Sequence, residues 1–170
     1  SLLEYSRAGQ VHAERETVDL RETIGHSIEL VAPANSEVTY KGGFGQVVTY
    51  RSPLEQIVRN LADNAFKHND NDHGSIVVTC DVADEVLHLS VADNGPGIPP
   101  KFHERVFGMF QTLQPRDKVE GSGMGLAILK KLIERHGGTI ELDSDPDVRR
   151  GTTFVVRWPV AAAPVSPGQT

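Results

Sequence analysis

The sequence lacks several features, and each absence argues against a class of protein or site. One cysteine, Cys80, stands in 170 residues, so an internal disulfide and a multi-cysteine metal site are both excluded. The formal net charge of −6 argues against a broad basic surface for nucleic acid. No run approaches the ~20 apolar residues of a transmembrane helix, and no secretory signal is visible at Ser1. The 38% hydrophobic content suffices for a compact core in one domain, or at most two.

Glycine, in contrast, is concentrated in two clusters. The first cluster is DNGPGI at residues 93–98, and the second is GSGMGL at residues 121–126. Glycine lets the backbone approach a ligand closely, and N–H groups just before a helix form an anion site. The residues after the second cluster have helical periodicity. The pair of clusters therefore predicts a phosphate-binding loop at a helix N-terminus.

A helix with a polar stripe is predicted from Ser52 to about Lys67. In the segment SPLE at its start, the serine is expected as N-cap, the proline as the first helical residue and the glutamate as the completion of a capping box. Asn60, Asn64 and Lys67 are spaced i, i+4 and i+7, so they share one face of this helix. That face is either a solvated surface or a ligand-facing edge, and the glycine clusters favour the ligand-facing edge.

Periodicity elsewhere predicts short strands and further helices. Strands are expected near residues 14–18, 37–41, 46–51, 75–82, 86–92, 139–143 and 152–158, and helices near 20–31, 99–106 and 123–136. Asp19 is expected to cap the first of these helices. The order predicts an α/β fold, a two-layer sandwich in which a mixed, mostly antiparallel sheet carries helices on one face.

Two segments and the single cysteine each have two competing interpretations. Residues 42–45, GGFG, could bind phosphate, but no helix follows them, so a hairpin turn is favoured. Residues 68–74 are rich in potential metal ligands, yet they lack the calcium-loop spacing, which favours a polar connection. Cys80 falls in a predicted strand, which favours a buried thiol over a reactive one. Residues 111–120 suit a mobile lid.

Four motifs follow one another along the chain. They are NLADNAFKH at residues 60–68, DNGPGI at 93–98, ERVFGMF at 104–110 and GSGMGL at 121–126. With these motifs in this order, the chain from about residue 12 to residue 160 resembles the catalytic, ATP-binding domain of sensor histidine kinases. That family shares its Bergerat-type fold with type II topoisomerase subunits, MutL repair proteins and Hsp90 chaperones. Residues 110–117 also resemble those of kinases linked to PAS or phytochrome-type sensors.

The resemblance implies a Mg·ATP site. Asp93 would accept a hydrogen bond from the adenine amino group, Gly95 and Gly97 would leave space for the base, and Asn64 would hold Mg²⁺. Phe107 and Phe110 are expected as core or hinge anchors beside it. The full set of expected ATP-binding residues is Asn60, Asn64, Lys67, His68, Asp93, Gly95, Gly97, Ile98, Phe107, Phe110, Gly121, Ser122, Gly123, Met124, Gly125, Leu126 and Thr152. Asn60, Asn64 and Lys67 are its expected catalytic members.

Asn60 indicates what the chain does with ATP. Relatives that hydrolyse ATP usually carry a glutamate at this position, and a carboxylate can activate water as a general base. An amide cannot remove a proton at neutral pH. The resemblance therefore implies transfer of the γ-phosphate to a histidine rather than to water.

The implied acceptor histidine lies on an upstream helical hairpin that also forms the dimer interface. Residues 1–11 are expected as the tail of that hairpin, residues 12–160 as the catalytic domain and residues 161–170 as a disordered tail. His12 lacks the sequence surroundings of an acceptor. The chain alone is thus expected to be a monomer that binds Mg·ATP without phosphorylating itself.

The expected partners are the upstream domain and the receiver domain of a response regulator, with no nucleic acid. The domain is expected in the cytoplasm, and the intact protein is expected as a homodimer that is either soluble or membrane-anchored. Two alternatives stay open. One is a kinase-like docking module that ignores nucleotide, and the other is an anti-sigma-type serine kinase of the same fold.

Overall fold

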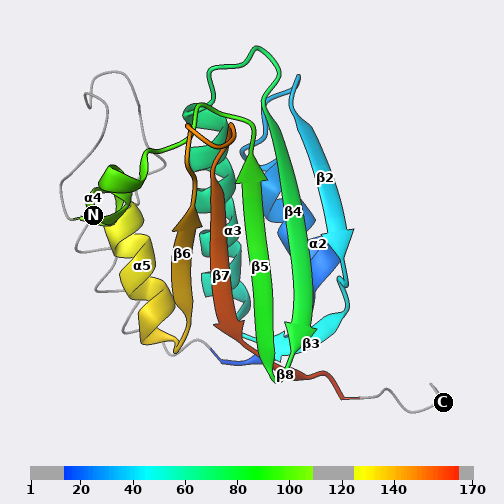
Figure 1. Ribbon diagram of the computed structural model, residues 1–170. Coiled ribbons are helices and arrows are strands. Elements are labelled where there is room, and N and C mark those ends of the chain that lie inside the picture. Colours follow the sequence, from blue (N-terminus) through cyan, green and yellow to red (C-terminus); the bar gives the residue numbers. More distant parts are fainter. Residues whose placement is uncertain (1–13, 109–124, 165–170) are drawn as a thin grey trace.

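Strands form one layer of the structure and helices form the other (Figure 1). The computed structural model describes residues 14–108 and 125–164. The main sheet has five strands in the order β2-β4-β5-β7-β6. Their bounds are β2 (Glu37–Gly42), β4 (Ser75–Ala83), β5 (Val86–Asp93), β6 (Thr139–Asp143) and β7 (Thr153–Pro159). Only the β2–β4 pair of this sheet is parallel, which confirms the predicted mixed, mostly antiparallel sheet.

The helices lie on one side of this sheet. They are α2 (Leu20–Glu29), α3 (Arg51–Lys67) and α5 (Leu126–Arg135), with the short η1 (Pro100–Phe102) and α4 (His103–Val106) after β5. In Figure 1, α2 and α3 lie behind the sheet and α5 lies beside β6. The carboxylate of Asp19 accepts a hydrogen bond from the backbone N–H of Glu22 at 3.0 Å, so the predicted cap of α2 is confirmed. No helix of the described residues combines the length and apolar character needed to cross a bilayer.

The core lies between the two layers, because alternate strand residues point toward the helices. The buried strand residues include Ile76, Val78, Cys80, Leu87, Leu89, Val91, Phe154, Val156 and Trp158. Cys80 is buried, as predicted, and burial raises the pKa of its thiol to about 12. The thiol is therefore protonated and unreactive at neutral pH. The predicted hairpin of β4 and β5 is also confirmed, with Asp84 and Glu85 at positive φ in its turn.

A second, three-stranded sheet was not predicted. It has the order β1-β3-β8, with β1 (Glu16–Asp19), β3 (Gln46–Thr49) and β8 (Ala161–Ala162) all antiparallel. Ala161 and Ala162 were expected in a disordered tail, and for these two residues the expectation is wrong. They pair with Val47 and Val48, because β7 ends at Pro159 and the residues that follow it lie next to β3.

The predicted hairpin between residues 37–41 and 46–51 is also wrong, because β2 and β3 belong to different sheets. Gly42 has φ of 102°, and a Cβ there would lie 2.1 Å from the carbonyl oxygen of Cys80. Gly43 donates its N–H to that same carbonyl at 2.8 Å. The glycines thus end the pairing of β2 with β4 and redirect the chain to the junction of β1 and α2, where Gly45 accepts a hydrogen bond from the N–H of Leu20 at 3.0 Å.

The start of α3 also differs from the prediction. Tyr50, not Ser52, holds the N-cap position, and no side chain caps the helix. The helix begins at Arg51, whose guanidinium bonds Glu16 in β1 at 2.6 Å and Thr23 in α2 at 3.2 Å. These contacts hold Arg51 in helical geometry, so the expected capping box at residues 52–55 does not form.

Trp158 connects the two sheets. Its side chain is fully buried, and its indole Nε1–H donates to the hydroxyl of Thr49 in β3 at 2.7 Å. That hydroxyl in turn donates to the carbonyl oxygen of Pro159 at 3.0 Å. Both polar groups are therefore satisfied inside an apolar region, where an unpaired group is costly.

The Thr49→Val substitution tests this connection. It keeps the shape of the side chain but leaves the indole N–H and a carbonyl oxygen without their partner. We expect the free energy of unfolding to fall by about 1–3 kcal/mol, measured by chemical denaturation. Thr79→Val is the matched control, because Thr79 lies on the face of β4 that points away from the core. It should change the free energy of unfolding by less than about 0.5 kcal/mol. Equal effects of the two substitutions would contradict the proposed role of Thr49.

Candidate functional site

Asp93 ends β5 with one carboxylate oxygen fully engaged. Its Oδ1 accepts the backbone N–H of Gly95 at 2.9 Å and that of Thr152 at 3.1 Å. Its own N–H donates to the carbonyl oxygen of Thr152 at 2.9 Å. Within the described residues Oδ2 makes no hydrogen bond, and no side-chain oxygen there is both buried and unpaired. Among the described residues Oδ2 thus has no partner, so it can accept a hydrogen bond from a ligand.

The carboxylate lies in a partly dehydrated environment. Burial raises the pKa of Asp93, against the opposing effects of the Gly95 and Thr152 N–H groups, His68 and Arg150. Burial likewise lowers the pKa of His68, against the attraction of Asp93 and Asp63. A neutral His68 and a half-buried carboxylate suit contact with an uncharged group of a ligand that donates a hydrogen bond.

Glycines bring the backbone close around this carboxylate. A Cβ on Gly95 would lie 3.1 Å from Oδ1 of Asp93, and Gly97 has φ of +84°, which favours glycine. Gly151 was not among the expected site residues. A Cβ on it would lie 2.3 Å from the carbonyl oxygen of Asp93, and its φ is +98°. The two turns can meet only because these positions are glycines.

Ser144 is a structural member of the site that sequence reasoning missed. It is 3% exposed, and its hydroxyl donates to the carbonyl oxygen of Gly151 at 2.8 Å. The same hydroxyl accepts the backbone N–H of Ile98 at 2.8 Å and lies 3.2 Å from the hydroxyl of Thr152. It thereby joins the DNGPGI loop to the β6–β7 turn. A serine after a predicted strand is common, so no local pattern signals this role.

The polar stripe of α3 is only partly solvated. Asn60 is 7% exposed, and its side-chain amide donates to the carbonyl oxygen of Gln56 at 2.7 Å. A simple solvated face therefore does not describe Asn60. Asn64 is half-buried one turn later. Lys67 forms an ion pair with Asp63 at 3.2 Å, near the end of the helix that leads to His68.

The predicted phosphate loop falls mostly outside the described residues. Phe110 and residues 121–124 lie there, as does the expected lid at 111–120. Gly125 is the N-cap of α5, and a Cβ on it would meet no atom within 4 Å. Phe107 packs edge-on against Phe154 at 6.2 Å between ring centroids, and Lys130 lies 5.3 Å from its ring. Its role as a core anchor agrees with these contacts.

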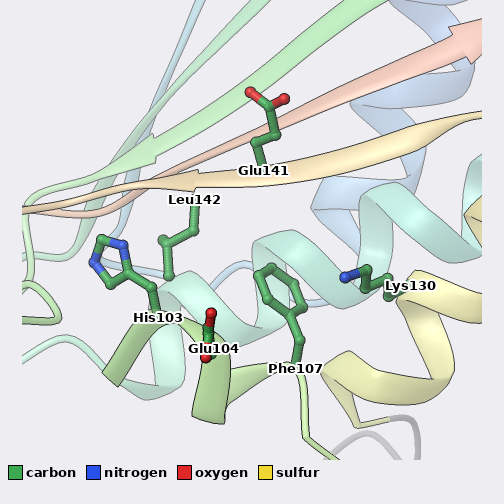
Figure 2. Close-up of a pocket in the computed structure, with 6 residues that line it drawn as sticks. All are labelled: His103, Glu104, Phe107, Lys130, Glu141 and Leu142. Carbon is green, nitrogen blue, oxygen red and sulfur yellow. The ribbon is translucent and has the colours of Figure 1, made fainter. Parts of the chain in front are cut away.

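An open pocket of about 620 Å³ lies between α4, α5 and β6 (Figure 2). It is lined by His103, Glu104, Phe107, Lys130, Glu141 and Leu142. Figure 2 shows Leu142 pointing toward His103 and Glu104, while Glu141 projects from the other side of β6. Asp93 and the polar stripe of α3 do not line it, and of the expected ATP-binding residues that the structure describes, Phe107 alone does.

The metal interpretation of residues 68–74 is not supported. In the described part of the chain, no three His, Cys, Asp or Glu side chains gather as a metal site would require. Asn69 and Asn71 instead bond to Asn94, beside the predicted adenine contact. The segment is the polar connection that the spacing favoured, and it borders the site.

With this geometry the chain belongs to the histidine kinase-, DNA gyrase B- and HSP90-like ATPase family, whose sequence profile matches residues 49–162. It is similar to the phytochrome-like protein Cph1 of Synechocystis, at 32% identity over 163 residues. That match covers 94% of this chain and 21% of Cph1, so the chain spans about a fifth of that relative. The family resemblance seen in the four motifs is confirmed.

Solved structures agree. The mycobacterial sensor histidine kinase MprB superposes with a TM-score of 0.73 at 33% identity, covering 88% of this chain and 99% of that one. Full-length ShkA in complex with AMPPNP superposes with a TM-score of 0.78 at 26% identity, covering 96% of this chain and 35% of ShkA. The chain is thus a catalytic ATPase domain of the sensor histidine kinase type, and the predicted fold class is confirmed.

The raised pKa of Asp93 makes a prediction about stability. A native pKa above the unfolded value means that the folded protein holds the proton more tightly, so stability falls as pH rises from the unfolded pKa through the native one. Asp93→Asn has no proton to lose, and its amide oxygen can still accept both N–H groups. We therefore expect it to gain thermal stability relative to the parent as pH rises from about 3 to about 7. A difference in melting temperature that stays constant over this range would contradict the prediction.

Proposed function

We propose that this chain binds Mg·ATP between Asp93 and α3 and delivers the γ-phosphate to a histidine on a helical hairpin. The observation that carries the proposal is the carboxylate of Asp93, with Oδ1 engaged by two backbone N–H groups and Oδ2 open to a ligand. Membership of the ATPase family supports it, as does the AMPPNP complex of the similar protein ShkA.

The carboxylate explains a choice of base. Oδ2 of Asp93 can accept a hydrogen bond from the amino group that adenine carries at its six-position. Guanine has a carbonyl oxygen there, and two acceptors facing each other repel. A Cβ on Gly95 would lie 3.1 Å from Oδ1 of Asp93, and one on Gly97 would lie 3.1 Å from Oγ of Ser144, so both glycines let the backbone pack close to the carboxylate. Ile98 and Thr152 are held at the same end through Ser144 and Asp93.

The phosphates would lie toward α3 and the start of α5. Asn64 offers a neutral amide oxygen on a half-buried helix face, and Lys67 and His68 follow at the end of α3. Mg²⁺ takes few protein ligands and keeps phosphate oxygens and water, so a single amide fits its needs. When bound, the ion would neutralise charge on the triphosphate. Gly125 and Leu126 begin α5, whose first N–H groups suit a phosphate.

Asn60 supports transfer to histidine rather than to water. Its amide is not basic, and its Nδ2 is engaged by the carbonyl oxygen of Gln56. In the proposed step a histidine ring nitrogen attacks the γ-phosphorus, a phosphorus–nitrogen bond forms, and the bond to the ADP oxygen breaks. The chain holds and orients ATP for that attack.

The remaining parts of the proposal concern the surrounding protein. Residues 1–11 would be the tail of the hairpin that carries the acceptor histidine and forms the homodimer, and residues 12–160 the catalytic domain. The phosphate would pass from that histidine to an aspartate of a response-regulator receiver domain, in the cytoplasm. The chain alone would be a monomer and would bind no nucleic acid.

Calorimetric titration with ATP, with and without Mg²⁺, tests the binding. The parent chain should bind Mg·ATP, and Asp93→Asn should lower the affinity by about tenfold or more, because a charged hydrogen bond contributes roughly 1.5–3 kcal/mol. Asp81→Asn, the same change at an exposed position of β4, is the control and should leave affinity unchanged. No heat with the parent would instead indicate a docking module that ignores nucleotide.

A phosphotransfer assay tests the reaction. With γ-labelled ATP we expect the 170-residue chain to remain unlabelled and to release little free phosphate. A longer protein in which the helical hairpin precedes this chain should acquire acid-labile label, as phosphohistidine does. Asn64→Ala in that protein should abolish labelling, whereas Asn35→Ala, at an exposed loop, should not. Acid-stable label on a partner's serine would identify a serine kinase instead.

A further inference from the structure

Asn94 directly follows Asp93 and is bonded through its side chain to the α3–β4 loop. Its Oδ1 accepts the backbone N–H of Ser75 at 3.0 Å and the side-chain amide of Asn69. Its Nδ2 donates to the carbonyl oxygen of His73 at 3.4 Å. All the hydrogen-bonding atoms of this side chain are thus used to hold the loop against the end of β5.

The main-chain oxygen of Asn94 adds contacts to a third segment. It accepts the side-chain amide of Asn71 at 2.7 Å and Nε of Arg150 at 2.9 Å. Arg150 belongs to the β6–β7 turn, and it also forms an ion pair with Asp70. Asn94 therefore joins three segments: the α3–β4 loop, the DNGPGI loop and the β6–β7 turn.

These contacts flank the two donors that hold Asp93. Gly95, whose N–H bonds Oδ1, is the next residue after Asn94. Thr152, the second donor, lies two residues after Arg150. A displacement of either turn would change the direction of one donor, and the carboxylate would rotate with it. The Arg150–Asp70 pair is half-exposed and itself contributes little, so the bond from Arg150 to Asn94 is the important contact.

We propose that Asn94 and Arg150 are positioning residues that aim Oδ2 of Asp93 and thereby set the discrimination between adenine and guanine nucleotides. The proposal rests on the proposed function, because it assigns the base contact to Asp93. Neither side chain has to touch the nucleotide. Their effect is on the direction of one carboxylate oxygen.

The test is the ratio of affinities for Mg·ATP and Mg·GTP, measured by calorimetry on the 170-residue chain. Asn94→Ala and Arg150→Ala should each lower the ratio by about fivefold, the effect of weakening one hydrogen bond. General destabilisation would weaken both nucleotides alike and leave the ratio unchanged. Arg149→Ala is the matched control, because its neighbouring guanidinium pairs with Asp143 at 2.7 Å instead of Asn94.

Hydrogen exchange supplies a readout without nucleotide. The N–H groups of Gly95 and Thr152 should exchange faster in Arg150→Ala than in the parent or in Arg149→Ala. If Asn94→Ala does not fold, Arg150→Ala decides, because its side chain is half-exposed. Parent-like ratios in both folded variants would overturn this proposal alone. A parent that binds neither nucleotide would overturn the proposed function and this proposal with it.

Discussion

The site depends on one constraint, which is that a carboxylate oxygen of Asp93 accepts two backbone N–H groups from different parts of the chain. Gly95 comes from the loop after β5, and Thr152 comes from the residue before β7. The antiparallel register of β5 and β7, in which Ala92 is opposite Thr153, brings them together. The pairing of β5 with β7 thus determines the direction in which the carboxylate of Asp93 points.

This arrangement has an energetic cost that the fold tolerates. The carboxylate is partly dehydrated, and burial raises its pKa despite the two N–H donors. Gly97 and Gly151 hold backbone conformations that other residues rarely adopt, and Ser144 uses its whole hydroxyl to join their turns. Unusual backbone conformations and shifted pKa values of this kind are concentrated at functional sites.

Much of the fold followed from the sequence, because hydrophobic periodicity is local. The alternation in residues 75–82 and 86–92 predicted a hairpin, and Asp19 predicted its helix cap. The hairpin expected across residues 42–45 failed, because the partners of β3 are β1 and β8, which lie far away in sequence. The capping box at Ser52 failed for a similar reason, since Arg51 is held by β1 and α2. Long-range contacts decided both cases.

The same distinction applies to the site. Asp93 and its glycines form a continuous motif, so they could be recognised directly. Ser144 and Arg150 reach the motif from 46 and 56 residues away, as shown by their bonds to Ile98 and Asn94. Neither has a local signal, because a serine after a strand and an arginine in a turn are both common. Their contacts with the motif exist only once the strands of the sheet have paired.

The small sheet has a mechanical consequence. Strand β3 lies between β1 and β8, so the first and last strands of the described chain are both attached to the same central strand. Figure 1 shows this sheet at the end of the molecule opposite the tip of β5. A force transmitted from one flank of the domain to the other would therefore travel through β3 and leave the ligand end unloaded.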